Sequence, residues 1–225
     1  MLAFPSDLAP IVGQQVSIGP GNPTSFVSAD VNGRISLLDN RAAAPFTSAV
    51  LGGTVTECEV IVKATDAGMQ RGWVREPSGA YRPDDGGPPI SEAALRVQAD
   101  PAGAGLDLAY SCAPPGAGER MGIDRDEDAI PDGLDNCPAW PNGPAGGTCT
   151  AGDPLLLGSE CLINADCGAV GFCSIAQEDG NANGTGDACE VVLLPEPRGL
   201  PALALPLLLF AALGARRAMG SPVAD

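Results

Sequence analysis

One acidic stretch, residues 124–135, constrains this chain more than any other part of its sequence. Aspartates stand at its first, third, fifth, ninth and twelfth positions, namely Asp124, Asp126, Asp128, Asp132 and Asp135. Five carboxylates this close repel one another, so we expect the segment to open when no cation is bound. Ca²⁺ takes six to eight oxygen ligands, and alternate residues of a tight loop can turn their oxygens inward. Ile130, at the seventh position, would add a backbone carbonyl, and Asp135 would bind through both carboxylate oxygens.

A second window with the same spacing follows at residues 179–190. Its first, third, fifth and ninth positions carry side chains with an oxygen, namely Asp179, Asn181, Asn183 and Asp187. Thr185 stands at the seventh position. Asparagine amides are neutral oxygen ligands, so we expect this window to bind a cation more weakly than the first. The competing interpretation is that both windows are solvated acidic loops that bind no metal.

Together the two windows resemble a thrombospondin type 3 repeat pair. The resemblance covers residues 124–138, ending in Asp-Asn-Cys-Pro, and residues 177–190, which begin at Gln177. It implies a segment wrapped around Ca²⁺ and tied by disulfides, with almost no hydrophobic core. The chain departs from the family pattern at Ala129, where glycine is usual, and in the long insertion at 139–176. If position 129 needs a positive φ, alanine costs roughly 1 kcal/mol there.

The composition indicates loop-rich material with a limited core. The 30 glycines and 22 prolines make up about 23% of the 225 residues, against an average near ~12%, and only 4% are aromatic. A net charge of −16 argues against nucleic acid as a partner, because binding it needs a basic face. The chain has no histidine, so the commonest general base is missing, and we expect no enzyme activity.

Eight cysteines predict a disulfide framework formed in an oxidising compartment. Their number is even, and six of them fall between residues 137 and 189, among glycine and proline. All eight are Cys58, Cys112, Cys137, Cys149, Cys161, Cys167, Cys173 and Cys189. Sequence alone allows about 105 pairings. We expect Cys58 to pair with Cys112, Cys137 with Cys189, and the four cysteines of the insertion among themselves.

Residues 1–118 predict a small, β-rich α+β region that resembles no family known to us. The expected strands are 11–18, 58–63 and 106–112, with a hairpin of 71–75 and 79–82 and helices over 34–39 and 91–99; Ser91 caps the last helix. Residues 114–118 are the linker to a calcium-binding segment at 119–190. The chain starts with no export signal, so we expect Met1 to lie inside a longer gene product.

The C-terminal stretch 194–217 predicts one short hydrophobic helix and resembles a PEP-CTERM sorting signal. Pro195, Glu196 and Pro197 precede an uncharged apolar run at 200–214, and Arg216 and Arg217 follow it. At ~1.5 Å per residue the run spans about 23 Å, which is short for a transmembrane helix. The resemblance implies passage through the inner membrane of a Gram-negative bacterium, cleavage by an exosortase and delivery to the cell surface. A permanent single-span anchor is the alternative.

These features favour an exported, surface-sorted, non-catalytic calcium-binding protein with a role in adhesion or the extracellular matrix, where polysaccharide is an expected partner. Two alternatives stay open. In the first, the chain is the C-terminal fragment of a larger secreted enzyme or redox protein whose catalytic part lies upstream. In the second, it is a membrane-anchored spacer whose acidic loops bind no metal.

Overall fold

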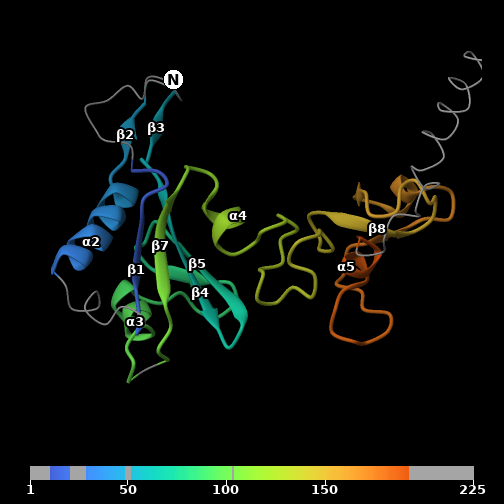
Figure 1. Ribbon diagram of the computed structural model, residues 1–225. Coiled ribbons are helices and arrows are strands. Elements are labelled where there is room, and N and C mark those ends of the chain that lie inside the picture. Colours follow the sequence, from blue (N-terminus) through green and yellow to red (C-terminus); the bar gives the residue numbers. More distant parts are fainter. Residues whose placement is uncertain (1–10, 21–28, 49–51, 103, 193–225) are drawn as a thin grey trace, which may run out of the picture. The chain divides into compact units, whose positions relative to one another are not determined.

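The computed structural model describes residues 11–20, 29–48, 52–102 and 104–192, and the described residues up to Val191 belong to one compact unit (Figure 1). Its first part is β-rich and contains few helices. The expected sorting signal at 194–217, with its apolar run and its two arginines, lies outside the described residues. Within the described residues, no helix is both long enough and apolar enough to cross a bilayer.

An antiparallel five-stranded sheet forms the centre of this first part, in the order β1-β7-β4-β5-β6. Its strands are β1 (Gln15–Ile18), β4 (Glu59–Asp66), β5 (Met69–Arg75), β6 (Tyr81–Pro83) and β7 (Leu108–Ala113). Two shorter strands, β2 (Phe46–Thr47) and β3 (Thr54–Val55), pair as a separate ribbon. The Cys58–Cys112 disulfide joins the start of β4 to β7 and is buried, which fits the expected pairing.

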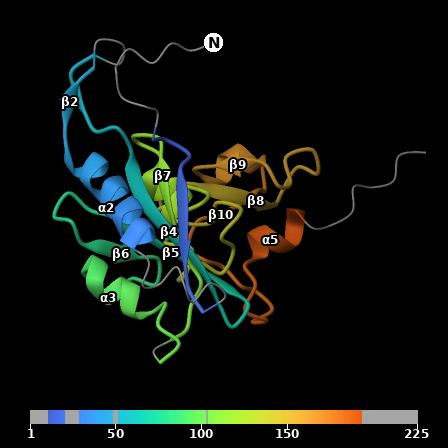
Figure 2. The same ribbon diagram turned by 60° about the vertical axis from the view of Figure 1, so that its left-hand side comes forward.

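Two helices cover one face of the sheet, α2 (Ala29–Ala43) and α3 (Glu92–Val97), and they lie on the same side of it in Figure 2. Alternate residues of β4, such as Val60 and Val62, point into this core and are fully buried. Ile35 and Leu38 of α2 pack against them. The Ser91 hydroxyl accepts a hydrogen bond from Ala94 N at 3.2 Å, so the predicted cap of α3 is confirmed.

The opposite face carries a smaller core, in which Ile61, Val74 and Ala113 of the sheet pack against Ile123. Ile123 directly follows the short helix α4 (Gly118–Gly122). Gly72 of β5 lies under the Gly122 carbonyl so closely that a Cβ at position 72 would collide with it. This glycine therefore lets the chain entering the first acidic stretch lie directly on the sheet.

The remaining described residues form a small disulfide-rich layer. Strands β8 (Gly147–Ala151), β9 (Glu160–Cys161) and β10 (Phe172–Ser174) make a sheet in the order β10-β8-β9, next to the 3₁₀ turn η1 (Asn164–Cys167). Cys149 pairs with Cys167 and Cys161 with Cys173, so the four insertion cysteines pair among themselves as expected. All four are buried and replace an apolar core. Helix α5 (Asp187–Val192) ends the described part of the chain.

Most predicted elements of the first part are present, with shifted ends. The strands 58–63 and 106–112 and the 71–75/79–82 hairpin correspond to β4, β7 and β5–β6. The predicted strand 11–18 begins only at Gln15, because residues 11–14 form a turn closed by Gln14 N and Ile11 O at 3.0 Å. The helix expected over 34–39 extends to the 15 residues of α2.

Candidate metal centre

The two acidic windows form two separate loops, which we call loop 1 (residues 124–135) and loop 2 (residues 179–190). Loop 1 follows α4, and loop 2 runs into α5. In loop 1, Asp124, Asp126 and Asp128 each direct a carboxylate oxygen to one place, and these oxygens all lie within 4.8 Å of one another. Asp128 is fully buried and Asp124 is only 7% exposed. The structure therefore brings together the first, third and fifth positions, as the alternating pattern predicted.

Several carboxylate oxygens of loop 1 are buried without any hydrogen-bond partner. They are Asp124 Oδ1, Asp126 Oδ2 and Asp135 Oδ2. Asp132 Oδ2 also accepts no hydrogen bond, but it lies 3.7 Å from Lys63 Nζ and 3.6 Å from Arg125 Nη2. A buried carboxylate oxygen that accepts no hydrogen bond is destabilising, because it has lost its water without a replacement. A cation coordinated by such oxygens would replace the lost hydration.

The backbone of loop 1 folds around its own side chains. Ala129 N donates to Asp124 Oδ2 at 3.2 Å, and Arg125 N donates to Asp132 Oδ1 at 2.8 Å. Within the turn, Asp128 N contacts Asp126 Oδ1 at 3.4 Å and Ile130 N donates to Asp128 Oδ1 at 2.7 Å. Each of these bonds fixes one carboxylate oxygen and leaves the other oxygen of that carboxylate for a different partner.

Loop 2 repeats this pattern position by position. Gly184 N donates to Asp179 Oδ2 at 2.8 Å, and Gly180 N donates to Asp187 Oδ1 at 2.9 Å. Asn183 N donates to Asn181 Oδ1 at 3.0 Å, and Thr185 N donates to Asn183 Oδ1 at 2.8 Å. Two segments of different composition have therefore folded to the same backbone and side-chain arrangement.

The backbone dihedrals agree as well. The fourth position of each loop has a positive φ, 62° at Glu127 and 57° at Ala182. The sixth position also has one, 74° at Ala129 and 85° at Gly184. A non-glycine residue in this region is strained by about 1 kcal/mol or more. Position 129 thus does require the left-handed conformation that we considered from the sequence, and alanine occupies it.

The loops differ at their twelfth position. In loop 1, Asp135 Oδ1 accepts Cys137 N at 2.7 Å, and Asp135 Oδ2 is one of the unpartnered oxygens. In loop 2, the Glu190 carboxylate accepts the Asn181 amide at 2.9 Å and the Asn183 amide at 2.7 Å. Two amide N–H groups thus compensate Glu190 in loop 2. The described residues contain no equivalent donor for Asp135 Oδ2.

The pKa values of the loop 1 carboxyls reflect this difference. Burial, followed by the nearby charges of Asp128 and Asp135, raises the pKa of Asp126 to about 7. Burial raises the pKa of Asp135 to about 6, although its hydrogen bond from Cys137 N opposes the shift. The pKa of Asp124 is also raised, mainly by burial. Near neutral pH the empty loop therefore holds protons that a bound cation would displace.

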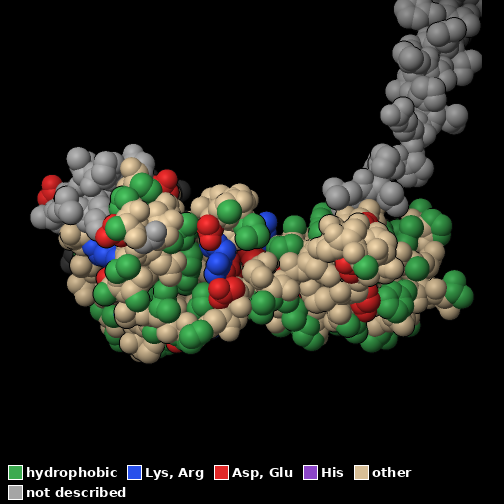
Figure 3. All heavy atoms as spheres, turned by 90° about the horizontal axis from the view of Figure 1, so that it is seen from below, with side chains coloured by type: hydrophobic (Ala, Val, Ile, Leu, Met, Phe, Trp, Pro, Cys, Tyr) green, Lys and Arg blue, Asp and Glu red, His purple; other side chains and the backbone are tan. Residues whose placement is uncertain are grey.

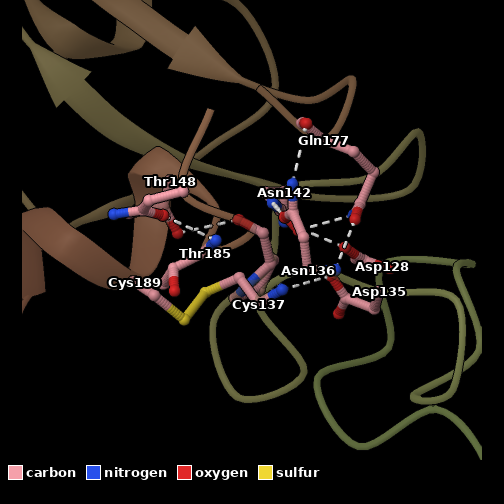
Figure 4. Close-up of a disulfide and its surroundings, with 11 residues drawn as sticks. Asp128, Asp135, Asn136, Cys137, Asn142, Thr148, Gln177, Thr185 and Cys189 are labelled. Carbon is pink, nitrogen blue, oxygen red and sulfur yellow. Dashed lines mark hydrogen bonds between the residues drawn. A yellow bond between two sulfur atoms is a disulfide. The ribbon is translucent and has the colours of Figure 1, made fainter. Parts of the chain in front are cut away.

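A polar cluster under the Cys137–Cys189 disulfide joins the loops (Figure 4). Asn136 N donates to Gln177 Oε1 at 2.8 Å, and Asn136 Nδ2 donates to the Gln177 carbonyl at 2.9 Å. Asn142, which is fully buried, donates its backbone N–H to Asp128 Oδ2 at 2.9 Å. The disulfide is the one expected, and Gln177 lies at the start of the second window. No sequence pattern singled out Asn142, which lies inside the insertion at 139–176.

Several basic groups outside the two loops are paired with carboxylates. Arg71 lies 3.1 Å from Asp84 and 2.6 Å from Asp85. Arg82 lies 3.0 Å from Glu119. On the face seen in Figure 3, basic side chains are few and lie beside acidic ones. Cys149, Cys161 and Cys167 lie together, but each is in a disulfide and no thiolate is left to bind a metal.

Comparison of the chain with family models, with curated proteins and with solved structures finds no match.

Proposed function

We propose that this chain is an exported, non-catalytic calcium-binding protein whose two loops each hold one Ca²⁺. The observation that carries the proposal is the repeated geometry of loops 1 and 2, combined with the buried oxygens of loop 1 that lack a partner. The two loops differ in sequence, yet they form hydrogen bonds at matching positions. They also have positive φ angles at the same two positions, the fourth and the sixth. A loop of this kind presents many oxygens in a flexible ring, which suits Ca²⁺ better than the smaller, octahedral Mg²⁺.

Loop 1 is the stronger site in this proposal. Its three unpartnered oxygens, on Asp124, Asp126 and Asp135, gain the most from a cation, whereas Glu190 of loop 2 already accepts two amide groups. Coordination of a cation by Glu190 would compete with those contacts from the Asn181 and Asn183 amide N–H groups. This cost adds to the weaker attraction of a site that has fewer carboxylates.

The proposal extends to location. Four disulfides, with no free cysteine, support an oxidising compartment. The PEP-CTERM resemblance of residues 194–217 further supports transient insertion in the inner membrane, release by an exosortase and a final place at the cell surface. There the calcium-stiffened segment would act in adhesion or in a polysaccharide matrix.

Calorimetric titration with Ca²⁺ tests the metal part of the proposal. We expect two Ca²⁺ per chain with unequal affinities, and much weaker heats with Mg²⁺. Asp126→Asn should weaken the tighter event, because it replaces one of the converging carboxylates by a neutral amide. Glu127→Gln is the matched control: it changes the same charge in the same loop at an exposed side chain, and should keep both events. Equal binding in the two variants would contradict the proposal.

A further inference from the structure

The ninth residue of loop 1, Asp132, is engaged by two basic side chains. Its Oδ2 lies 3.7 Å from Lys63 Nζ and 3.6 Å from Arg125 Nη2. The Asp132 side chain is only 5% exposed, whereas those of Lys63 and Arg125 are 31% and 51% exposed, so water screens the Arg125 pair more than the Lys63 pair. Its Oδ1 accepts Arg125 N at 2.8 Å, and its own N–H donates to the Ile123 carbonyl at 2.7 Å.

Loop 2 provides the internal comparison. Its ninth residue, Asp187, makes the same two backbone contacts, with Gly180 N at 2.9 Å and with the Glu178 carbonyl at 2.8 Å. In the described part of the chain, however, no ion pair involves Asp187. The loop can therefore form its geometry without basic partners at the ninth position, and only loop 1 has them.

Lys63 reaches loop 1 from the central sheet. It lies two residues after Ile61 on β4, and therefore on the face that α4 covers. Gly133 N donates to the Asp84 carbonyl at 3.1 Å and holds the loop against the same face. Lys63 is the only lysine in the chain.

We propose that Lys63 is a positioning residue that acts as a built-in counter-ion of loop 1 and ties calcium occupancy to the sheet. This inference rests on the proposed calcium binding. Loop 1 has five carboxylates at its spaced positions, and loop 2 has three; the positive charges of Lys63 and Arg125 bring loop 1 close to the balance of loop 2. Lys63 therefore stabilises the empty loop on the sheet, and its charge opposes the arriving cation.

The two effects of Lys63 give a specific experimental signature. Lys63→Met should lower the melting temperature in EDTA, because the empty loop loses its counter-ion, and should lower it less in saturating Ca²⁺. By linkage, the same substitution should tighten Ca²⁺ binding to loop 1, by about fivefold to tenfold from simple Coulomb attraction. Lys63→Arg should restore both values, since it retains the charge.

The titrations use the full chain with loop 2 weakened by Asp179→Asn, so that they report on loop 1. Arg34→Met is the matched control, because it removes one positive charge from an exposed position of α2, the helix on the opposite face of the sheet. It should leave both the affinity and the calcium-dependent melting shift unchanged. A Lys63→Met chain that binds Ca²⁺ with unchanged or weaker affinity would overturn the inference.

A second measurement needs no substitution. Reductive ¹³C-methylation of the wild-type chain labels the sole lysine and the terminal amine, and both keep their charge. The Lys63 resonance should shift in step with Ca²⁺ binding to loop 1, whereas an invariant resonance at saturation would refute the proposed role. A chain that binds no Ca²⁺ at all would instead refute the proposed function, so the two failures are distinguishable.

Discussion

Ala129 provides a direct test of the strain in loop 1. Its φ is 74°, and the equivalent position of loop 2 is a glycine with φ 85°. An L-residue in the left-handed region costs about 1–2 kcal/mol, and the greater freedom of glycine in the unfolded chain offsets about half of that. Ala129 is exposed, so replacing it loses little packing. We therefore expect Ala129→Gly to raise the free energy of unfolding by about 1 kcal/mol.

The reverse substitution in loop 2 is the control. A Cβ at Gly184 would meet no atom within 4 Å, so Gly184→Ala adds backbone strain without a steric clash. It should destabilise the chain by the same amount, about 1 kcal/mol.

Thermal unfolding with intact disulfides and saturating Ca²⁺ measures both changes. In a unit of this size, 1 kcal/mol corresponds to about 2–4 °C in melting temperature. We expect Ala129→Gly to melt higher and Gly184→Ala to melt lower by that interval. An Ala129→Gly variant that melts at the wild-type temperature or below would show that the left-handed backbone at position 129 does not strain loop 1.

Three further predictions concern pH, the disulfides and the tail. Because folding raises the pKa of Asp126 to about 7 and that of Asp135 to about 6, the empty loop should lose stability as pH rises from 4 to 7, while Ca²⁺ affinity should rise about twentyfold from pH 6 to pH 8. Titration in buffers of different ionisation enthalpy checks the accompanying proton release; none at pH 6.5 would contradict the shifts. Replacing Cys137 and Cys189 by serine opens a link with a sequence separation of 52 and should cost about 4 kcal/mol, against about 3 for the Cys161–Cys173 link with a separation of 12; denaturant unfolding that ranks the two in the opposite order would argue against the chain-entropy account. In a host with the sorting enzyme, the mature protein should end near Pro197, and intact-mass measurement that recovers residues 218–225 on the surface protein would exclude processing.

Local patterns in the sequence predicted much of this structure. The β-branched alternation around Val60 and Val62 gave the central strand, and the spacing of carboxylates gave the residues that converge in loop 1. Such features depend on residues close in the chain, whose periodicity decides which side chains share a face. Helix α2 was underestimated because Gly33 and polar residues weaken its pattern, and packing of Ile35 and Leu38 compensates for that.

Apart from the disulfide pairings, contacts between distant segments could not be predicted from the sequence. Lys63 is separated by about seventy residues from the carboxylate that it approaches, and nothing in β4 marks it as different from an ordinary solvated strand residue. Asn142 was hidden for a similar reason, since its importance lies in the buried position of its backbone N–H beside Asp128. Non-local pairings of this kind follow from the topology of the fold.

The stretch between loops 1 and 2 begins and ends at neighbouring positions, which affects how its length and sequence can vary. Gln177 N donates to the Asn142 carbonyl at 3.0 Å, so the two ends of the intervening stretch already touch. A segment with adjoining ends can be lengthened, shortened or exchanged without moving its host. The two disulfides of residues 143–176 both close within that stretch, so most of it could be exchanged for another small domain if the bond from Ala145 N to the Asp128 carbonyl, at 2.9 Å, is kept. The adjoining ends at Asn142 and Gln177 are therefore an attachment point where a different small domain could be joined to the frame formed by loops 1 and 2.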